Sequence, residues 1–158
     1  MGLSVGEVAP DFMLAGIDGS TGRAGTFSLG SYRGGPVVVV FYPGDNSAVC
    51  TAQLVDYTSG IKGLDDLGVA VLAISPQDVD SHRSFAAANG GFAFPLLSDP
   101  GKKVGRAWGN LGLLDLYRRS TVVLDADGVV RYTQRHLGPG LSFKPIGDVI
   151  AAVARSID

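Results

Sequence analysis

The chain has a single cysteine, Cys50, and its neighbours place it where a thiol can be reactive. The apolar, β-branched run 37–42 predicts a strand buried on both faces, and Pro43 ends that run. Because Ser47 can cap a helix, Cys50 falls in a first helical turn, where unpaired backbone N–H groups and the helix dipole favour a thiolate. A lone cysteine is more often a small buried apolar residue, but this position favours thiolate chemistry.

One cysteine excludes an internal disulfide, a CxxC redox pair and a multi-cysteine zinc site. A cysteine–histidine dyad would need His82 or His136, the only histidines, beside Cys50. We expect His82 to face solvent from a predicted helix, and His136 to follow a hairpin. The histidines and aspartates show no metal-binding spacing, and no nucleotide-binding glycine motif occurs, so no cofactor is expected.

The elements around Cys50 follow from hydrophobic periodicity and turn residues. Helices are predicted over 48–67, from Asp78 or Asp80 to Asn89, over 102–108, and from Pro145 with Ile146, Val149, Ile150, Val153 and Ile157 on the inner face. Strands are predicted over 37–42, 69–74 and 94–97, in an N-terminal hairpin of 10–14 and 26–29 that turns at 16–19, and in a second hairpin of 121–124 and 129–134.

This order predicts an α/β fold, a three-layer α/β/α sandwich with a mixed central sheet. It matches the thioredoxin fold with an extra N-terminal β-hairpin and an insertion near 91–118. The chain shows no repeat, low-complexity block or linker, so we expect one domain over 1–158.

Composition narrows the classes of function. Apolar residues make up 46% and charged residues 18%, which is enough for a hydrophobic core. The charge of 13 − 15 = −2 gives no support to a nucleic-acid or membrane-surface role. The N-terminus lacks a secretory pattern, and the longest apolar run, 37–42, is far shorter than the about 20 residues that cross a bilayer. We therefore expect a cytoplasmic protein, in which a free thiol stays reduced.

Several segments resemble one known family. The motif Pro43-x-x-x-Ser47-x-x-Cys50 resembles the Pro-x-x-x-Thr/Ser-x-x-Cys signature of peroxiredoxins, and the wider string 37–51 is similar to their bacterioferritin-comigratory, or Q-type, branch. Further similarity lies in the expected order, over 5–12, 94–99 and 119–125, so the resemblance covers nearly the whole chain.

The resemblance implies a thiol-dependent peroxidase without a metal, haem or flavin. The Cys50 thiolate would attack the O–O bond of hydrogen peroxide or a small organic hydroperoxide and become a sulfenic acid. The hydroxyl of Ser47 would form hydrogen bonds with the thiolate and the peroxide. Arg119 would favour the thiolate and stabilise the charge that develops on the peroxide oxygens, and Pro43 would limit solvent around the sulfur. Backbone N–H groups near Cys50 would hold the peroxide oxygens.

Each of these roles has a simpler alternative. Ser47 can be only a helix cap, Pro43 only a strand terminator, and either Arg118 or Arg119 only a surface charge. Arg119 is preferred because its six-residue offset to Asp125 matches the family.

One departure from the family bears on the catalytic cycle. Many Q-type members have a resolving cysteine five residues after the reactive one, but Val55 stands there in this chain. A one-cysteine cycle is implied, completed by an external thiol such as thioredoxin, glutaredoxin or a low-molecular-weight thiol. Gln53 also departs from the usual glutamate. The alternatives are a peroxide-sensing redox switch or binding protein with little turnover, or a protein that keeps only the fold; monomer and homodimer both stay open.

Overall fold

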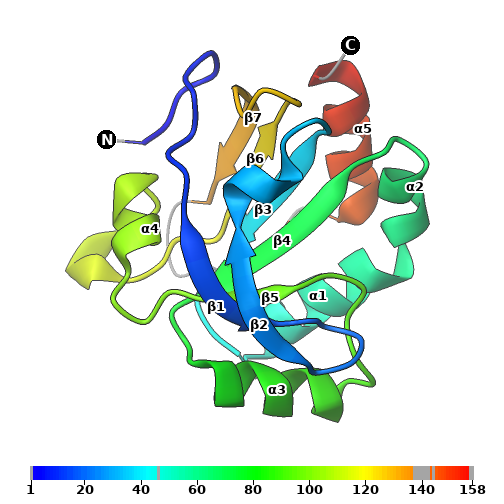
Figure 1. The fold of residues 1–158 in the computed structure, drawn as a ribbon, viewed down its shortest axis with the longest axis vertical. Coiled ribbons are helices and arrows are strands. Elements are labelled where there is room, and N and C mark those ends of the chain that lie inside the picture. The colour runs from blue at the N-terminus through cyan, green and yellow to red at the C-terminus, as the bar shows by residue number, and fades with distance from the viewer. Residues whose placement is uncertain (1, 46, 137–142, 144, 157–158) are drawn as a thin grey trace.

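The computed structural model describes residues 2–45, 47–136, 143 and 145–156. Within these residues seven strands form one sheet in the order β2-β1-β5-β4-β3-β6-β7 (Figure 1). The strands are β1 Met13–Ile17, β2 Ala24–Ser28, β3 Val37–Phe41, β4 Ala70–Ser75, β5 Leu96–Ser98, β6 Ser120–Leu124 and β7 Val130–Arg135. The α-helices are α1 Ala48–Ser59, α2 Ile61–Asp65, α3 Val79–Ala88, α4 Lys103–Ala107 and α5 Ile146–Ser156, and the 3-10 helices are η1 Leu29–Tyr32 and η2 Leu113–Asp115.

Strand β3 lies at the centre of the sheet and leads directly to Cys50. All five of its residues are buried, as its continuous apolar pattern predicts. It pairs in parallel with β4 and antiparallel with β6, so the predicted mixed sheet is confirmed. Alternate β3 side chains enter different apolar clusters: Val38 and Val40 join one, and Val39 and Phe41 join the other.

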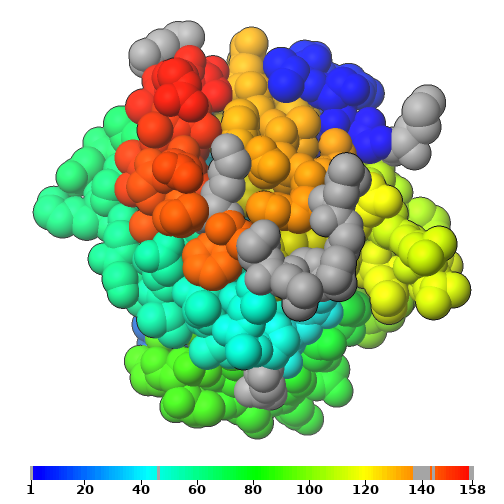
Figure 2. Space-filling view, turned by 180° about the vertical axis from the view of Figure 1, so that it is seen from behind, coloured from blue at the N-terminus to red at the C-terminus, as the bar shows by residue number. Residues whose placement is uncertain are grey.

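The two clusters account for the helical layers. The first cluster contains side chains of α1, α3 and α5, including Leu54, Phe85 and Val149, and Cys50 also belongs to it. The second contains Trp108 and residues of α4 and the N-terminal segment. Figure 2 shows α5 between α2 and β7 on one face of the molecule, in agreement with its contacts to both elements.

The predicted helix over 48–67 is wrong as a single helix, because Gly60 divides it into α1 and α2. A Cβ atom at Gly60 would lie 2.5 Å from Cγ2 of Ile146, and one at Gly63 would lie 2.5 Å from Cδ1 of Ile150. These glycines therefore allow α5 to approach closely. The break interrupts the periodicity beyond α1, and Leu67, predicted on the buried face, is 38% exposed.

The N-terminal hairpin is present, but its turn lies later in the chain than predicted. Gly16 lies inside β1 opposite Leu97, where a Cβ would collide with the β5 backbone. The chain turns instead at Asp18, whose Oδ1 accepts hydrogen bonds from the backbone N–H groups of Ser20 and Thr21 at 2.8 and 3.1 Å.

The other helices differ from prediction only at their ends. Asp78 is the N-cap of α3, since its Oδ1 accepts a 2.8 Å hydrogen bond from the N–H of Ser81. On α5 the predicted inner-face residues Ile146, Val149 and Val153 are buried, whereas Ile157 lies outside the described residues. Over the described part of the chain, no helix is both long and apolar enough to span a bilayer.

Candidate active site

Cys50 lies in the first turn of α1, directly after the segment that follows β3. Ser47 is the N-cap of this helix: its Oγ accepts a 3.1 Å hydrogen bond from the N–H of Cys50. The carbonyl of Ser47 accepts bonds from the N–H and the hydroxyl of Thr51 at 2.9 and 2.8 Å. The position of Ser47 therefore determines where the first turn, and with it Cys50, begins.

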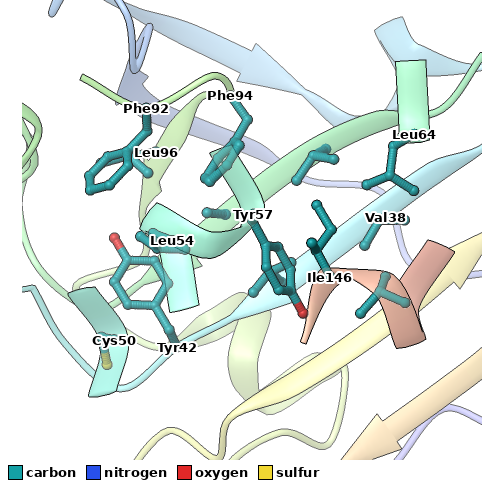
Figure 3. Close-up of a cluster of buried hydrophobic side chains, with 14 of the residues drawn as sticks. Val38, Tyr42, Cys50, Leu54, Tyr57, Leu64, Phe92, Phe94, Leu96 and Ile146 are labelled. Atoms are coloured by element: carbon teal, nitrogen blue, oxygen red, sulfur yellow. The ribbon is translucent and has the colours of Figure 1, made fainter. Parts of the chain in front are cut away.

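The Cys50 side chain points into the protein. Cys50 is only 1% exposed. Figure 3 shows it at the edge of the first apolar cluster, beside Tyr42. An enclosed sulfur next to a helix N-terminus meets a low-dielectric environment in which a nearby charge acts strongly.

That charge comes from Arg119, which directly precedes β6. Its Nη2 donates a hydrogen bond to Cys50 Sγ at 3.1 Å, although the two residues are 69 positions apart in the chain. Arg119 is itself 1% exposed. A guanidinium is always protonated, so at this distance it favours the anionic form of the sulfur.

The structure distinguishes Arg119 from its neighbour Arg118. Arg118 is half-buried and lines a surface cavity, whereas Arg119 is buried against the sulfur. Successive side chains on an extended segment point to opposite faces, so only one of the two can reach Cys50. The six-residue offset to Asp125 in the sequence indicates the same residue, Arg119.

Gln53 is part of the site, and the sequence indicated it only as a departure from the family. Its Oε1 accepts a hydrogen bond from Nη1 of Arg119, and the residue is 1% exposed. Burial raises the pKa of Tyr57, one turn further along α1, and hydrogen bonds to Gln53 and Thr121 oppose that rise. The three-residue spacing from Cys50 puts Gln53 on the same helix face, which is the signal that could have identified it.

Pro43 lies on the wall of a cavity of about 490 Å³ beside the segment that leads to α1. The cavity is also lined by Pro76, Lys102, Gly112, Leu113, Leu116, Tyr117 and Arg118. A larger cavity of about 590 Å³ lies between the β1–β2 turn and the end of α3, and it is lined by none of the four predicted site residues. The structure thus puts Ser47 and Arg119 each in direct contact with Cys50, and it puts Pro43 in a neighbouring wall.

The expectation that His82 faces solvent is wrong, because the residue is completely buried. Its Nδ1 lies 2.8 Å from Oδ2 of Asp45, and its Nε2 lies 2.9 Å from the carbonyl oxygen of Leu97. His82 and Phe85 share one face of α3, so helical periodicity could have predicted burial. His136 follows β7 and donates its backbone N–H to the carbonyl of Arg119 at 2.9 Å.

The contacts at Cys50 define what the site can do. A thiolate stabilised by a fixed cation and a helix N-terminus is a nucleophile. Within the described residues, no group of three or more His, Cys, Asp or Glu side chains could hold a metal ion. A thiolate at this position supports nucleophilic attack and reversible oxidation.

Comparisons with known proteins agree with this geometry. The sequence model described as the AhpC/TSA family matches residues 5–133. A Mycobacterium tuberculosis protein that carries the name peroxiredoxin is 37% identical over 139 residues, covering 84% of this chain and 85% of its own length. Peroxiredoxin Q, chloroplastic, of Triticum aestivum is 37% identical over 148 residues, covering 88% of this chain and 65% of that protein.

Solved structures confirm the predicted fold. Mycobacterium tuberculosis AhpC superposes with a TM-score of 0.88 at 20% identity, covering 98% of both chains. The bacterioferritin comigratory protein of Xanthomonas campestris has a TM-score of 0.75 at 27% identity, covering 90% of both chains. The peroxiredoxin form of the thioredoxin fold is thus shared with this chain. Together with the family match and the 37% identical relatives, these likenesses show that the chain belongs to the AhpC/TSA family of peroxiredoxins, the thiol-dependent peroxidases.

Proposed function

We propose that this peroxidase reduces hydrogen peroxide and small organic hydroperoxides by a one-cysteine cycle at Cys50. The observation that carries the proposal is the 3.1 Å contact between Arg119 Nη2 and Cys50 Sγ at the start of α1. This contact favours the nucleophilic form of the Cys50 sulfur. The sequence holds no second cysteine that could complete the cycle within the chain.

In the first step the Cys50 thiolate attacks one peroxide oxygen. A sulfur–oxygen bond forms as the O–O bond breaks, and the leaving oxygen takes a proton to become water or an alcohol. The sulfur is oxidised to a sulfenic acid, and the peroxide is reduced. Negative charge moves from sulfur to the leaving oxygen, so fixed donors around both atoms lower the barrier.

The neighbouring residues fit separate parts of this step. The two nitrogens of the Arg119 fork, one on Cys50 and one on Gln53, hold the guanidinium in one orientation beside the reacting sulfur. The Ser47 Oγ accepts from the N–H of Cys50, which leaves its own hydroxyl proton for the peroxide or the thiolate. Pro43, which carries no backbone N–H, restricts solvent at the wall of the neighbouring cavity.

In the second half of the cycle an external thiol condenses with the sulfenic acid. A mixed disulfide forms and water leaves, after which a second thiol releases Cys50 as a thiol. Thioredoxin, glutaredoxin and low-molecular-weight thiols can all supply these two electrons. We also propose a cytoplasmic location, supported by the free thiol that such a cycle needs in its resting state.

Burial of Cys50 favours one alternative, a peroxide-sensing switch. A sulfur that is 1% exposed is difficult for a bulky thiol to reach, which would slow turnover and let the oxidised form accumulate. Turnover number separates the two functions, because a peroxidase consumes many peroxide molecules per chain and a switch about one.

The direct test compares peroxide consumption by the wild-type protein and Cys50→Ser, with dithiothreitol as reductant. Ser59→Ala is a matched control, since Ser59 lies at the end of α1 and its hydroxyl donates to the carbonyl of Val55 at 3.0 Å, one turn back in the same helix. We expect multiple turnovers for wild type and control and none for Cys50→Ser. Equal rates in all three proteins would remove Cys50 from the reaction.

A further inference from the structure

A second buried polar cluster lies beside the reactive cysteine, and it is centred on Asp45. The Asp45 side chain is only 1% exposed. Its Oδ1 accepts a 2.8 Å hydrogen bond from the Tyr42 hydroxyl, and its Oδ2 accepts one at 2.7 Å from the Ser81 hydroxyl. Its backbone N–H donates to Oε1 of Gln77 at 2.9 Å. Both the side chain and the main chain of Asp45 are therefore fixed by surrounding elements.

His82 on α3 completes this cluster. Its Nε2 lies 2.9 Å from the carbonyl oxygen of Leu97, and because a carbonyl only accepts, this nitrogen is the donor. Its Nδ1 lies 2.8 Å from Oδ2 of Asp45, so one further proton lies between these two atoms. His82 thus joins the Tyr42 and Ser81 hydroxyls in compensating the burial of the Asp45 side chain.

Asp45 is close in sequence to the groups that react. It lies two residues before Ser47, the N-cap of α1. The Oγ of Ser47 accepts a hydrogen bond from the N–H of Cys50, and its carbonyl accepts one from the N–H of Thr51. Arg119 comes from a different part of the chain, at the start of β6. The Cys50 sulfur and Arg119 thus reach their 3.1 Å contact from separate parts of the chain, and Asp45 is a fixed point close to the first of them.

We propose that His82 is a positioning residue for the peroxide reaction and acts through Asp45. The His82–Asp45 pair ties the segment that leads to Ser47 onto α3, which keeps the first turn of α1 at the correct distance from Arg119. This inference rests on the proposed reaction of Cys50 with peroxide. It assigns a role to a histidine that makes no hydrogen bond with the reacting sulfur among the contacts described for it.

Two amide substitutions separate the two contacts of the imidazole ring. In His82→Asn the amide nitrogen takes the place of Nδ1 and can still donate to Asp45, but the contact with Leu97 is lost. In His82→Gln the amide nitrogen takes the place of Nε2 and can still donate to Leu97, but Asp45 loses its partner. Both variants replace an imidazole by an amide in the same buried site, so each is the control for the other.

The rate constant for the reaction of Cys50 with hydrogen peroxide is measured by stopped flow. The rate of alkylation of Cys50 by iodoacetamide is measured in a parallel experiment. Alkylation needs only an accessible thiolate, whereas the peroxide reaction also needs aligned donors. We expect His82→Gln to react with peroxide about 100-fold more slowly, as misplacement by about 1 Å does, and His82→Asn to stay within about threefold of wild type. Alkylation of His82→Gln should become faster, because the first turn of α1 is less firmly held.

Unfolding in urea is measured for each variant, so that a loss of activity can be compared with a loss of stability. Equal peroxide rates in both variants, or rates that fall only in proportion to stability, would overturn the proposal. If His82→Gln does not fold, Ser81→Ala removes one donor to Asp45 and leaves His82 in place. It should slow the peroxide reaction by about fivefold, and an unchanged rate would overturn the proposal. A wild-type protein that does not react with peroxide would instead contradict the proposed function itself.

Discussion

Replacing Arg119 by methionine removes the charge beside the sulfur and keeps an unbranched stem in place of the buried arginine stem. The guanidinium nitrogen lies 3.1 Å from Cys50 Sγ, and the centre of its charge lies slightly further away, at about 4 Å. At an effective dielectric constant of about 20, a unit charge at about 4 Å interacts with negative charge on the reacting atoms by about 4 kcal/mol, which corresponds to about 1,000-fold in rate. The charge thus accounts for a large part of the expected reactivity.

The assay is the rate constant of Cys50 with hydrogen peroxide across a range of pH. We expect Arg119→Met to react about 1,000-fold more slowly than wild type at neutral pH, because the charge that stabilises the reacting atoms is gone. Arg119→Lys keeps the charge but loses the fork that contacts both Cys50 and Gln53, so it should fall between Met and wild type. Arg131→Met makes the same change at an exposed residue of β7 and serves as the control.

Two results would contradict this role of Arg119. If Arg119→Met reacts within about threefold of wild type at neutral pH, the charge does not control the reaction. If Arg119→Lys is as slow as Arg119→Met, the geometry of the fork and not the charge is decisive. Both comparisons require that the variants unfold at urea concentrations similar to wild type.

Three further predictions concern the surroundings of the site and the fold. Gln53→Glu adds a buried negative charge that competes for Arg119, so the pH–rate profile should move to higher pH and the neutral rate should fall by about tenfold; an unmoved profile would contradict this. Gly60→Ala should reduce the free energy of unfolding by about 1–3 kcal/mol in urea, because its Cβ would lie 2.5 Å from a side chain of α5, whereas Gly147→Ala, with open space around it, should not be destabilising. Hydrogen bonds from Ser20 hold the pKa of Asp18 below its usual value, so the stability that Asp18 contributes is present above the usual pKa and is lost as pH falls through the lowered pKa. Asp18→Asn should therefore lose stability less steeply than wild type as the pH falls, and an identical dependence of unfolding on acid pH would argue against this prediction.

The sequence predicted the part of the site that depends on local pattern. The continuous run in β3, the proline after it and the capping serine are all consecutive, so they locate Cys50 at a helix start without any tertiary information. Gly60 shows the limit of such reasoning. Its place in the helical pattern is visible in the sequence, but the close approach of Ile146 on α5, far along the chain, is not.

The parts that were missed depend on partners distant in sequence. A polar residue on a helix is usually exposed, so the sequence predicts His82 at the surface; its burial is compensated by Asp45, 37 residues earlier, and by the carbonyl of Leu97, 15 residues later. The same holds for Gln53, whose role depends on Arg119, 66 residues away. Arg119 itself was identified through family resemblance, since no local pattern connects a residue before β6 with the start of α1.

The most direct test of a one-cysteine cycle at Cys50 is the intact mass of the reduced protein after one equivalent of hydrogen peroxide, followed by a low-molecular-weight thiol. We expect the mass of one added oxygen atom on Cys50, then a mixed disulfide with the thiol, and finally the return of the starting mass when excess thiol is present. Peroxide consumption while Cys50 keeps its original mass throughout would contradict it.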